Sequence, residues 1–325
     1  MKLVQTLVVR DEADIVDAQL SYHLNAGVDF VLAADHESRD GTTDILESYA
    51  RDGVVLRIPV HGEMRDGPWR THMARLAASE HGADWVINTD ADEFWMPHNQ
   101  PLKDMLAGIP ESHGIVFAVS RHFVPRPESV DVQSFAEQMT VRVSPAVAIN
   151  DPTSPYRPHL KAAHRADAAI TISHGAHTAY SRRWRALQHW HPAEVLHFPF
   201  RSMEQWEHKG VRRARGDSPL GQYVTALLAS ERGRTADRYR ALVVDDSALE
   251  RGRAEGSLTV DTRLRDELRA RGREREERSA APENADLLVD GAAARDADVI
   301  RLQRSLDGLS ARVVALDDRA ARPPR

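Results

Sequence analysis

The sequence predicts an α/β protein: a Rossmann-like, mostly parallel sheet flanked by helices, with a helical C-terminal extension. Two observations predict the sheet. Short apolar runs alternate with segments of helical apolar spacing through residue 95, and strand–helix units of roughly 25–30 residues build parallel sheets with right-handed crossovers. A third observation predicts the extension, because residues 202–275 combine helical spacing with a high density of charge.

Seven elements alternate in the first 95 residues, each identified by its apolar pattern. Residues 3–9, 30–34, 54–58 and 85–88 are short apolar runs and are expected to be strands. Apolar residues recur at helical spacing in 13–25, 43–51 and a segment running from Pro68 to Gly82. Glycines follow all three segments as stop signals, and a proline opens the third, so each is expected to be a helix.

After Trp95 the pattern is looser and predicts shorter elements. Strands are expected at 114–119, 139–143, 169–173 and 195–198, and 150–158 is a proline-containing loop. Residues 279–284 (SAAPEN) have the composition of a linker. Beyond them, apolar residues follow a heptad seam, which predicts a docking or oligomerisation element or a loosely ordered amphipathic tail: Val299, Leu302, Leu306, Leu309, Val313 and Leu316.

Composition excludes several classes of protein. The 325 residues include no cysteine, which excludes disulfides, thiolate nucleophiles and iron–sulfur clusters. A net charge of −6 argues against a nucleic-acid partner, since that binding depends on clustered cations. The N-terminus lacks a secretory apolar region, and no uncharged apolar window reaches membrane-spanning length. The expected location is cytoplasmic, with peripheral contact at the inner membrane face as an alternative.

Polar residues follow the predicted strands and locate a candidate site. In parallel sheets, ligands bind beyond the carboxyl ends of the strands. The strongest signal is INTDADEFW, in which a buried strand leads into Asp90, Asp92 and Glu93. Two carboxylates at this spacing can share a hard divalent cation, Mn²⁺ or Mg²⁺, with substrate phosphates. The alternative interpretation is an acidic loop that caps a helix.

A second polar segment, 35–43, follows the second predicted strand. Asp35 is a suitable acceptor for a ribose hydroxyl or a base N–H at the end of that strand. Asp40 precedes Gly41 and leads into a helix that Thr42 or Thr43 can cap. Asp40 and Gly41 are equally well explained as turn residues, so this segment supports either a ligand contact or a purely structural loop.

Three motifs together resemble a known family. They are RDEADIV after the first strand, D-x-x-S-x-D-G-T-x-x-I-L from Asp35, and W-V-I-x-x-D-A-D-E-F-W from Trp85. The chain is similar here to family 2 glycosyltransferases of the GT-A fold, and most to a bacterial subgroup with a D-A-D-E-F-W block. The likeness is close over 1–95. It continues loosely to about 210 through VLHFP, RSMEQW and Lys209.

The resemblance implies roles for individual residues. Arg10, Asp11 and Glu12 are expected to face the nucleotide, with Asp40 nearby, and Asp35 to hold the uracil or ribose. Asp90 and Asp92 are expected to contact the metal and the donor diphosphate. Glu93 is expected to contact the donor sugar or to support these ligands. The chain departs from the family at Asp11–Glu12, where many members carry Asn-Glu.

Histidines far downstream supply further metal-ligand candidates. GT-A enzymes often take a third metal ligand from such a histidine, and imidazole is an acceptable ligand for Mn²⁺. His197 lies on an apolar strand inside the VLHFP block, and His177 and His174 belong to the segment SHGAH. Each of them can instead be a hydrogen-bonded core or surface residue.

The catalytic base is the least defined part of the predicted site. An inverting transferase needs a carboxylate near the acceptor hydroxyl, and Glu137 and Asp131 are candidates. Both can equally be surface residues. Lys161 and Arg165 can approach the diphosphate as cations, or lie on the surface.

The sequence therefore predicts metal-dependent transfer of a sugar from a nucleotide-sugar donor, expected to be a UDP-sugar. The acceptor is a hydroxyl of a glycan, a lipid-linked glycan or a small molecule. The predicted domains are 1–210 (nucleotide-binding half 1–95, acceptor and metal half 96–210), a helical extension 211–278, and a linker with tail 279–325. Nucleotidyl transfer is an alternative, although VVRDEADIV lacks the glycine-rich phosphate loop of that class. A catalytically silent scaffold is another.

Overall fold

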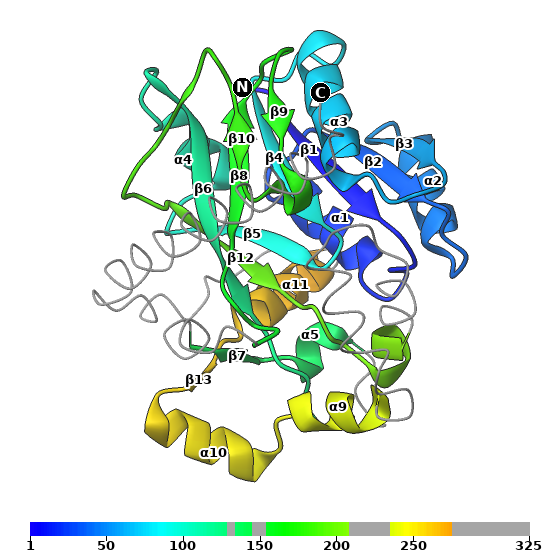
Figure 1. Ribbon diagram of the computed structural model, residues 1–325, viewed down its shortest axis with the longest axis vertical. Coiled ribbons are helices and arrows are strands. Elements are labelled where there is room, and N and C mark those ends of the chain that lie inside the picture. The colour runs from blue at the N-terminus through cyan, green and yellow to red at the C-terminus, as the bar shows by residue number, and fades with distance from the viewer. Residues whose placement is uncertain (129–133, 145–153, 208–234, 275–325) are drawn as a thin grey trace, which may run out of the picture.

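The computed structural model describes residues 1–128, 134–144, 154–207 and 235–274. Its largest sheet has nine strands, ordered β3-β2-β1-β4-β8-β6-β12-β5, with β11 paired to β6 (Figure 1). The strands are β1 Leu3–Val9, β2 Phe30–His36, β3 Val55–Val60, β4 Trp85–Asp90, β5 Glu93–Pro97, β6 His113–His122, β8 Leu160–Arg165, β11 Arg185–Ala186 and β12 Ala193–His197.

Most strands of this sheet run in one direction. β3, β2, β1 and β4 are parallel to one another, and β12 is parallel to β6. Only β8 and β5 run the opposite way among the strands described, because β8 is antiparallel to both β4 and β6, and β5 is antiparallel to β12. The predicted mostly parallel sheet is therefore confirmed.

Helices cover both faces of the parallel half, and alternation along β1 explains why. Leu3 and Leu7 pack in one apolar cluster with Val16 and Leu20 of α1. On the other face, Val4 and Val8 pack with Met73 of α3. Strands buried on both faces have this continuous apolar composition. The helices are α1 Val16–Asn25, α2 Thr42–Arg51, α3 Asp66–Ser79, α4 Leu102–Ala107, α5 Phe135–Gln138, the 3₁₀ turn η1 His174–Ala176, α9 Thr235–Leu242, α10 Asp246–Glu255 and α11 Arg263–Glu274.

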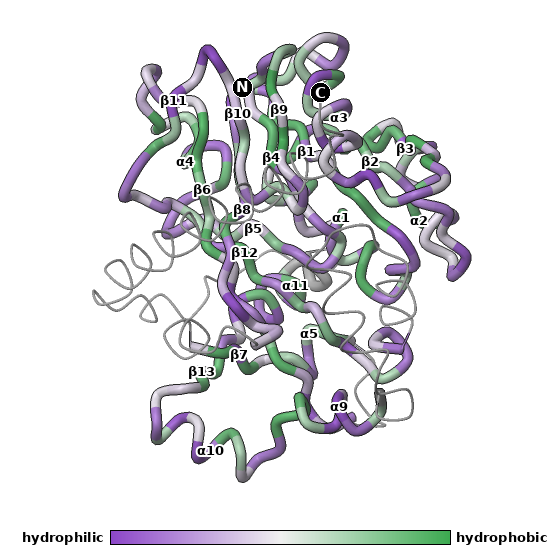
Figure 2. The backbone as a smooth tube through the Cα atoms, viewed as in Figure 1, coloured by the Kyte–Doolittle hydropathy of each residue, from purple (hydrophilic) through white to green (hydrophobic). Residues whose placement is uncertain are grey.

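Apolar residues concentrate along the central strands, and hydrophilic segments lie mainly in the outer loops (Figure 2). The predicted strand at 169–173 is shorter than expected, since only β9, Thr171–Ile172, forms there and pairs with β10, Ala179–Tyr180. No described helix is long and apolar enough to cross a membrane. The heptad seam lies outside the described residues.

The C-terminal part of the described chain is helical, as predicted, but it also contributes a strand. β13, Leu258–Val260, pairs with β7, Val141–Val143, which joins the extension to the larger unit. α9 and α10 lie together at the end of the molecule farthest from the N-terminus (Figure 1). The pairing of β13 with β7 holds the highly charged C-terminal extension against the larger unit.

A buried ion-pair network fixes α11 against the sheet. Glu194 of β12 accepts hydrogen bonds from Arg121 at 2.5 Å and from Arg263 at 2.7 Å. Arg263 also pairs with Asp261, which Arg142 contacts at 2.9 Å. Burial alone would raise the pKa of Glu194, but Arg121 and Arg263 outweigh it and hold that pKa well below its usual range.

This network predicts a pH-dependent loss of stability in Glu194→Gln. Breaking a buried ion pair costs about 3–5 kcal/mol, and we expect that loss in urea unfolding at pH 7. Because the folded pKa is depressed, the stabilisation is complete above the unfolded pKa of about 4.3 and declines by up to about 1.4 kcal/mol per pH unit below it. The wild-type advantage should therefore shrink at pH 3. Glu250→Gln, at an exposed position, is the control, and an advantage that is independent of pH would contradict the role of the ion pairs.

Candidate active site

One edge of the large sheet collects polar residues from five strands. β4, β6 and β12 run in the same direction and end there at Asp90, His122 and His197. β8 and β5 run in the opposite direction and begin there, so Lys161 and Glu93 lie at the same edge. Strand direction therefore brings together residues that are far apart in the sequence.

Asp90 lies between two buried cations. Its Oδ1 accepts a hydrogen bond from Arg70 of α3, and its Oδ2 accepts one from Lys161 Nζ at 2.7 Å. Arg70 and Lys161 are 0% and 1% exposed, whereas the side chain of Asp90 is 35% exposed. Burial alone would raise the pKa of Asp90, but the two cations hold it well below its usual range. Asp90 is therefore fixed as an anion at the rim of the site.

The same cations hold the neighbouring acids. Arg70 donates to Asp66 at 2.8 Å, and Lys161 lies 2.8 Å from Oε1 of Glu93. The other oxygen of Glu93 accepts the backbone N–H of Asp90 at 2.9 Å. Glu93 is fully buried, so it supports the loop that carries Asp90 instead of facing solvent.

Asp92 faces a different pair of side chains. Its Oδ1 lies 3.4 Å from Nε2 of His197, and its Oδ2 lies 3.8 Å from Arg201. Arg201 also binds Asp14 and Glu12, which lie 187 and 189 positions earlier in the sequence. Asp92 and His197, two of the predicted metal-ligand candidates, are therefore adjacent.

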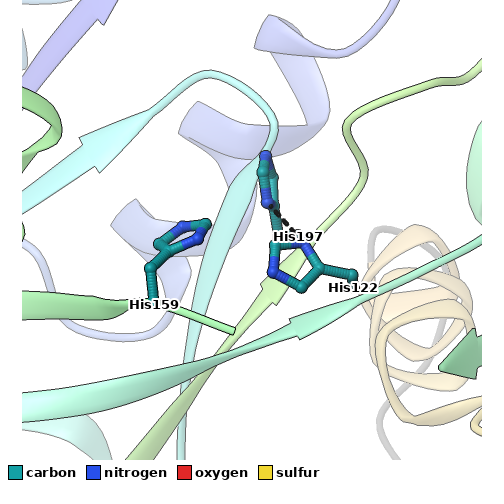
Figure 3. A group of neighbouring side chains, drawn as sticks. All are labelled: His122, His159 and His197. Atoms are coloured by element: carbon teal, nitrogen blue, oxygen red, sulfur yellow. Dashed lines mark hydrogen bonds between the residues drawn. The ribbon is translucent and has the colours of Figure 1, made fainter. Parts of the chain in front are cut away.

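Three histidines gather at this edge (Figure 3), and one of them, His197, lies next to Asp92. His122, His159 and His197 each have a ring nitrogen within 4.8 Å of the others. Nδ1 of His197 lies 3.0 Å from Nδ1 of His122, and Nε2 of His122 lies 3.0 Å from the carbonyl oxygen of Arg157. Burial, together with the neighbouring histidines, keeps the pKa of His122 and His159 well below the ordinary value. These two rings are therefore neutral near pH 7.

The site carries an excess of negative charge. Among the described residues, three cations bind six carboxylates around Asp90 and Asp92: Arg70, Lys161 and Arg201 against Glu12, Asp14, Asp66, Asp90, Asp92 and Glu93. A neutral pair of imidazoles does not compensate this excess. A divalent cation is the kind of ligand that such a site attracts.

The loop after β1 contacts the site through Glu12. Glu12 is 7% exposed and pairs with Arg201, while its backbone N–H donates to Thr42 at 2.9 Å. Asp11 has a φ of 49° and accepts the N–H of Arg39 at 2.7 Å. Arg10 lies 3.5 Å from Nδ1 of His36. These contacts join the first and second predicted polar segments into one surface.

Asp35 and Asp40 are both engaged in holding that surface together. Asp35 is 2% exposed and accepts hydrogen bonds from Thr43 at 2.7 Å and Arg57 at 3.1 Å. Asp40 accepts the N–H of Ala13 at 2.9 Å and both donors of Thr42. These contacts are structural, and the contacts predicted with the donor nucleotide stay predictions.

The other two histidine candidates lie near the cluster but outside it. His177 donates from Nδ1 to the carbonyl oxygen of Leu160 at 2.9 Å, and its ring centroid is 4.8 Å from that of His159. Burial lowers the pKa of His177 to about 3. His174 is 75% exposed, with Nδ1 3.6 Å from Asp66. Of the three predicted histidines, His197 has the contact with Asp92 that a shared ion needs.

Only one of the two predicted base candidates, Glu137, lies within the described residues. Glu137, on α5, is paired with Arg269 through both oxygens. Asp131 lies outside the described residues. Of the two predicted cations, Lys161 reaches Asp90, while Arg165 packs on the ring of Trp85 at 4.8 Å, at the opposite end of β4.

Sequence reasoning missed Arg70, His122 and His159. His122 is the last residue of β6, three residues beyond the predicted end of that strand. Had the strand been predicted at its full length, His122 would have been identified as a polar residue at a strand end. His159 precedes β8, which was not predicted. Arg70 lies inside an amphipathic helix, and nothing in its local pattern distinguishes it from a surface arginine.

Comparison with known proteins identifies one family. Residues 4–214 match the family model described as Glycosyltransferase family 92. The match supports a glycosyltransferase, as the resemblance implied, and does not confirm family 2 or the subgroup with the D-A-D-E-F-W block. No curated protein matches the chain.

Solved structures are similar only at a distance. One is TarS 1–349 of S. aureus in complex with UDP, with 15% identity over 90% of this chain and 95% of that chain and a TM-score of 0.35. Another is glucosyl-3-phosphoglycerate synthase of Mycobacterium tuberculosis in complex with Mn²⁺, UDP-glucose and phosphoglyceric acid, with 23% identity over 37% and 44% and a TM-score of 0.26. Scores this low support no conclusion about the activity.

Proposed function

The chain belongs to glycosyltransferase family 92, and from this premise we propose that it transfers a sugar from a nucleotide-sugar donor to an acceptor hydroxyl. We propose a UDP-sugar as donor and a divalent cation, Mn²⁺ or Mg²⁺, bound at the sheet edge that carries Asp92. The acceptor is a glycan, a lipid-linked glycan or a small molecule. Family membership supports sugar transfer, and the acidic edge supports the cation.

The observation that carries the metal proposal is the pairing of Asp92 with His197. Oδ1 of Asp92 and Nε2 of His197 are 3.4 Å apart, and two bonds of about 2.1 Å to one ion span that separation. A carboxylate and an imidazole together suit Mn²⁺. The donor atoms present therefore fit the ion that the family resemblance implies.

The remaining residues have separate tasks in this proposal. Asp92 and His197 would hold the ion, which would neutralise charge that develops on the leaving diphosphate. Asp90 is oriented at the rim by Arg70 and Lys161. Because both of its oxygens already contact cations, its contacts favour Asp92 as the direct ligand.

The nucleotide and acceptor contacts are proposed from position. The joined surface formed by Arg10, Asp11, Glu12, Asp35 and Asp40 follows the ends of β1 and β2, where nucleotides bind in parallel sheets. We propose 1–95 as the nucleotide-binding half, 96–210 as the acceptor and metal half, and the C-terminal tail as an oligomerisation or docking element.

The general base is a separate proposal. Glu137 can accept a proton from the acceptor only after it leaves Arg269, which now pairs with both of its oxygens. Asp131 is the second candidate. Replacing the residue that acts as the base should lower turnover at saturating donor, whereas replacing a surface residue should leave turnover unchanged.

Purified protein tests the proposed function directly. We expect it to release UDP slowly from one or more UDP-sugars when Mn²⁺ or Mg²⁺ is present, with water replacing the acceptor. Excess EDTA should remove the activity, and added Mn²⁺ should restore it, because the ion neutralises the leaving diphosphate. Full activity in excess EDTA would contradict a metal-dependent reaction, and release from no UDP-sugar would contradict the donor class.

A further inference from the structure

Hydrogen bonding around His122 defines where its proton lies. Nε2 of His122 is 3.0 Å from the carbonyl oxygen of Arg157. A carbonyl oxygen only accepts hydrogen bonds, so Nε2 of His122 carries the hydrogen and donates it. His122 is 3% exposed, and burial favours the neutral form of an imidazole. Its other nitrogen, Nδ1, is therefore an acceptor.

That acceptor in turn defines the proton of His197. Nδ1 of His122 and Nδ1 of His197 are 3.0 Å apart, at hydrogen-bond distance (Figure 3). Two ring nitrogens form a hydrogen bond only when one of them carries a hydrogen. Since Nδ1 of His122 accepts, Nδ1 of His197 donates. In the neutral form of His197 this places the lone pair on Nε2.

The lone pair faces Asp92. Nε2 of His197 is 3.4 Å from Oδ1 of Asp92, so a divalent cation between the two atoms would be bound by both, and without one a hydrogen on Nε2 would take its place. In metal sites, a ligating histidine commonly donates its other N–H to a partner that fixes its tautomer and ring orientation. His122 has the position of such a partner, and Arg157 is the next acceptor in the chain.

We propose that His122 is a positioning residue: with the carbonyl of Arg157, it holds His197 in the tautomer that presents Nε2 to Asp92 and a divalent cation. This inference rests on the proposed function, because it assigns the purpose of the tautomer to the metal site proposed there. Nδ1 of His197 donates to Nδ1 of His122, and Nε2 of His122 donates to the carbonyl oxygen of Arg157. Nε2 of His197 is then the ring nitrogen of this pair that faces Asp92.

The same three rings offer a competing arrangement. His122, His159 and His197 are close enough to share one ion through one nitrogen each. That arrangement breaks one of the two hydrogen bonds of His122, since the nitrogen that binds the ion would be the one that now faces His197 or the one that faces Arg157. The two arrangements therefore predict different hydrogen bonds for His122.

The first test reads the tautomer without any metal. Nitrogen-15 labelled histidine in the wild-type protein gives the protonation of each ring nitrogen by long-range N–H correlation NMR. We expect hydrogen on Nδ1 of His197 and on Nε2 of His122. A His197 whose Nδ1 carries no hydrogen would overturn the proposal, whether or not the protein transfers sugar.

The second test measures Mn²⁺ affinity by calorimetry and by electron paramagnetic resonance. His122→Leu removes the acceptor, and we expect Mn²⁺ to bind about 10–100-fold more weakly, as is usual when a ligand loses its supporting partner. His122→Asn places an amide oxygen near the position of Nδ1 and should recover most of that affinity. His159→Leu should leave the affinity nearly unchanged.

A buried control and the outcomes complete the design. His164→Asn alters another buried histidine of the β8 region, about 16 Å from His159 by the rise of a strand, and should not affect binding. Normal Mn²⁺ binding by His122→Leu would overturn the inference while leaving the proposed function intact. Loss of binding in His122→Asn and His159→Leu alike would place the ion among the three rings. A wild-type protein that binds no Mn²⁺ would contradict both proposals.

Discussion

Asp92→Asn is expected to remove nearly all sugar transfer while the protein stays folded. Asparagine keeps the size of the side chain but loses the charge that faces His197 and Arg201. A metal ion contributes several kcal/mol to stabilising a transition state, so losing about 4 kcal/mol of it slows the reaction about 1,000-fold. UDP release from the accepted donor, at saturating Mn²⁺, measures the effect.

Two comparisons separate this loss from general damage. Asp52→Asn changes an exposed carboxylate at the end of α2 and should keep wild-type activity. Thermal unfolding without metal should be similar in Asp92→Asn and wild type, because Arg201 keeps Glu12 and Asp14 as partners. If Asp92→Asn turns over like the wild type, Asp92 is not the ligand of a required ion.

Arg70→Met is expected to have the largest effect on stability. Arg70 is fully buried and binds Asp66, Asp90 and the carbonyl oxygen of Thr89. Burial alone would lower its pKa, but the surrounding carboxylates outweigh this and raise it. Removing one partner of a buried ion pair costs about 3–5 kcal/mol. For a domain of this size we expect a fall in Tm of about 10 °C.

A matched substitution and a double variant test this explanation. Arg240→Met breaks an exposed pair with Asp237, in which both side chains are about two-thirds exposed, and surface pairs contribute about 0–1 kcal/mol. Combining Asp66→Leu with Arg70→Met should recover part of the stability, because the isolated buried charge is removed. A Tm of Arg70→Met equal to that of Arg240→Met would show that Arg70 is replaceable by apolar packing.

Local sequence patterns were sufficient where the structure is local. The apolar runs gave the first four strands, because a strand buried on both faces must be apolar along its length. The same regularity located the acids after β4, since polar residues directly after such a run lie at the carboxyl edge. Asp92 was proposed from its strand end and His197 from its motif, and the structure brings the two side chains together.

Strands that run against the majority escaped this reasoning. β8 begins at the site edge instead of ending there, so His159 and Lys161 lie at the start of a strand. The local sequence pattern does not show in which direction this strand runs. His122 was lost for a smaller reason, since β6 extends three residues beyond its apolar core. In both cases the missing information was pairing, which depends on residues 40 or more positions away.

The sequence alone therefore determined the α/β class, the parallel order of the first half and the acidic edge, because each follows from apolar periodicity and from polar residues at strand ends. Only the tertiary structure decided which charges meet. Arg70 reaches Asp90 across 20 positions, Lys161 across 71, and Arg201 reaches Glu12 across 189. Such pairs form because burying a carboxylate requires a cation beside it, and the folded chain, not the local pattern, selects that cation.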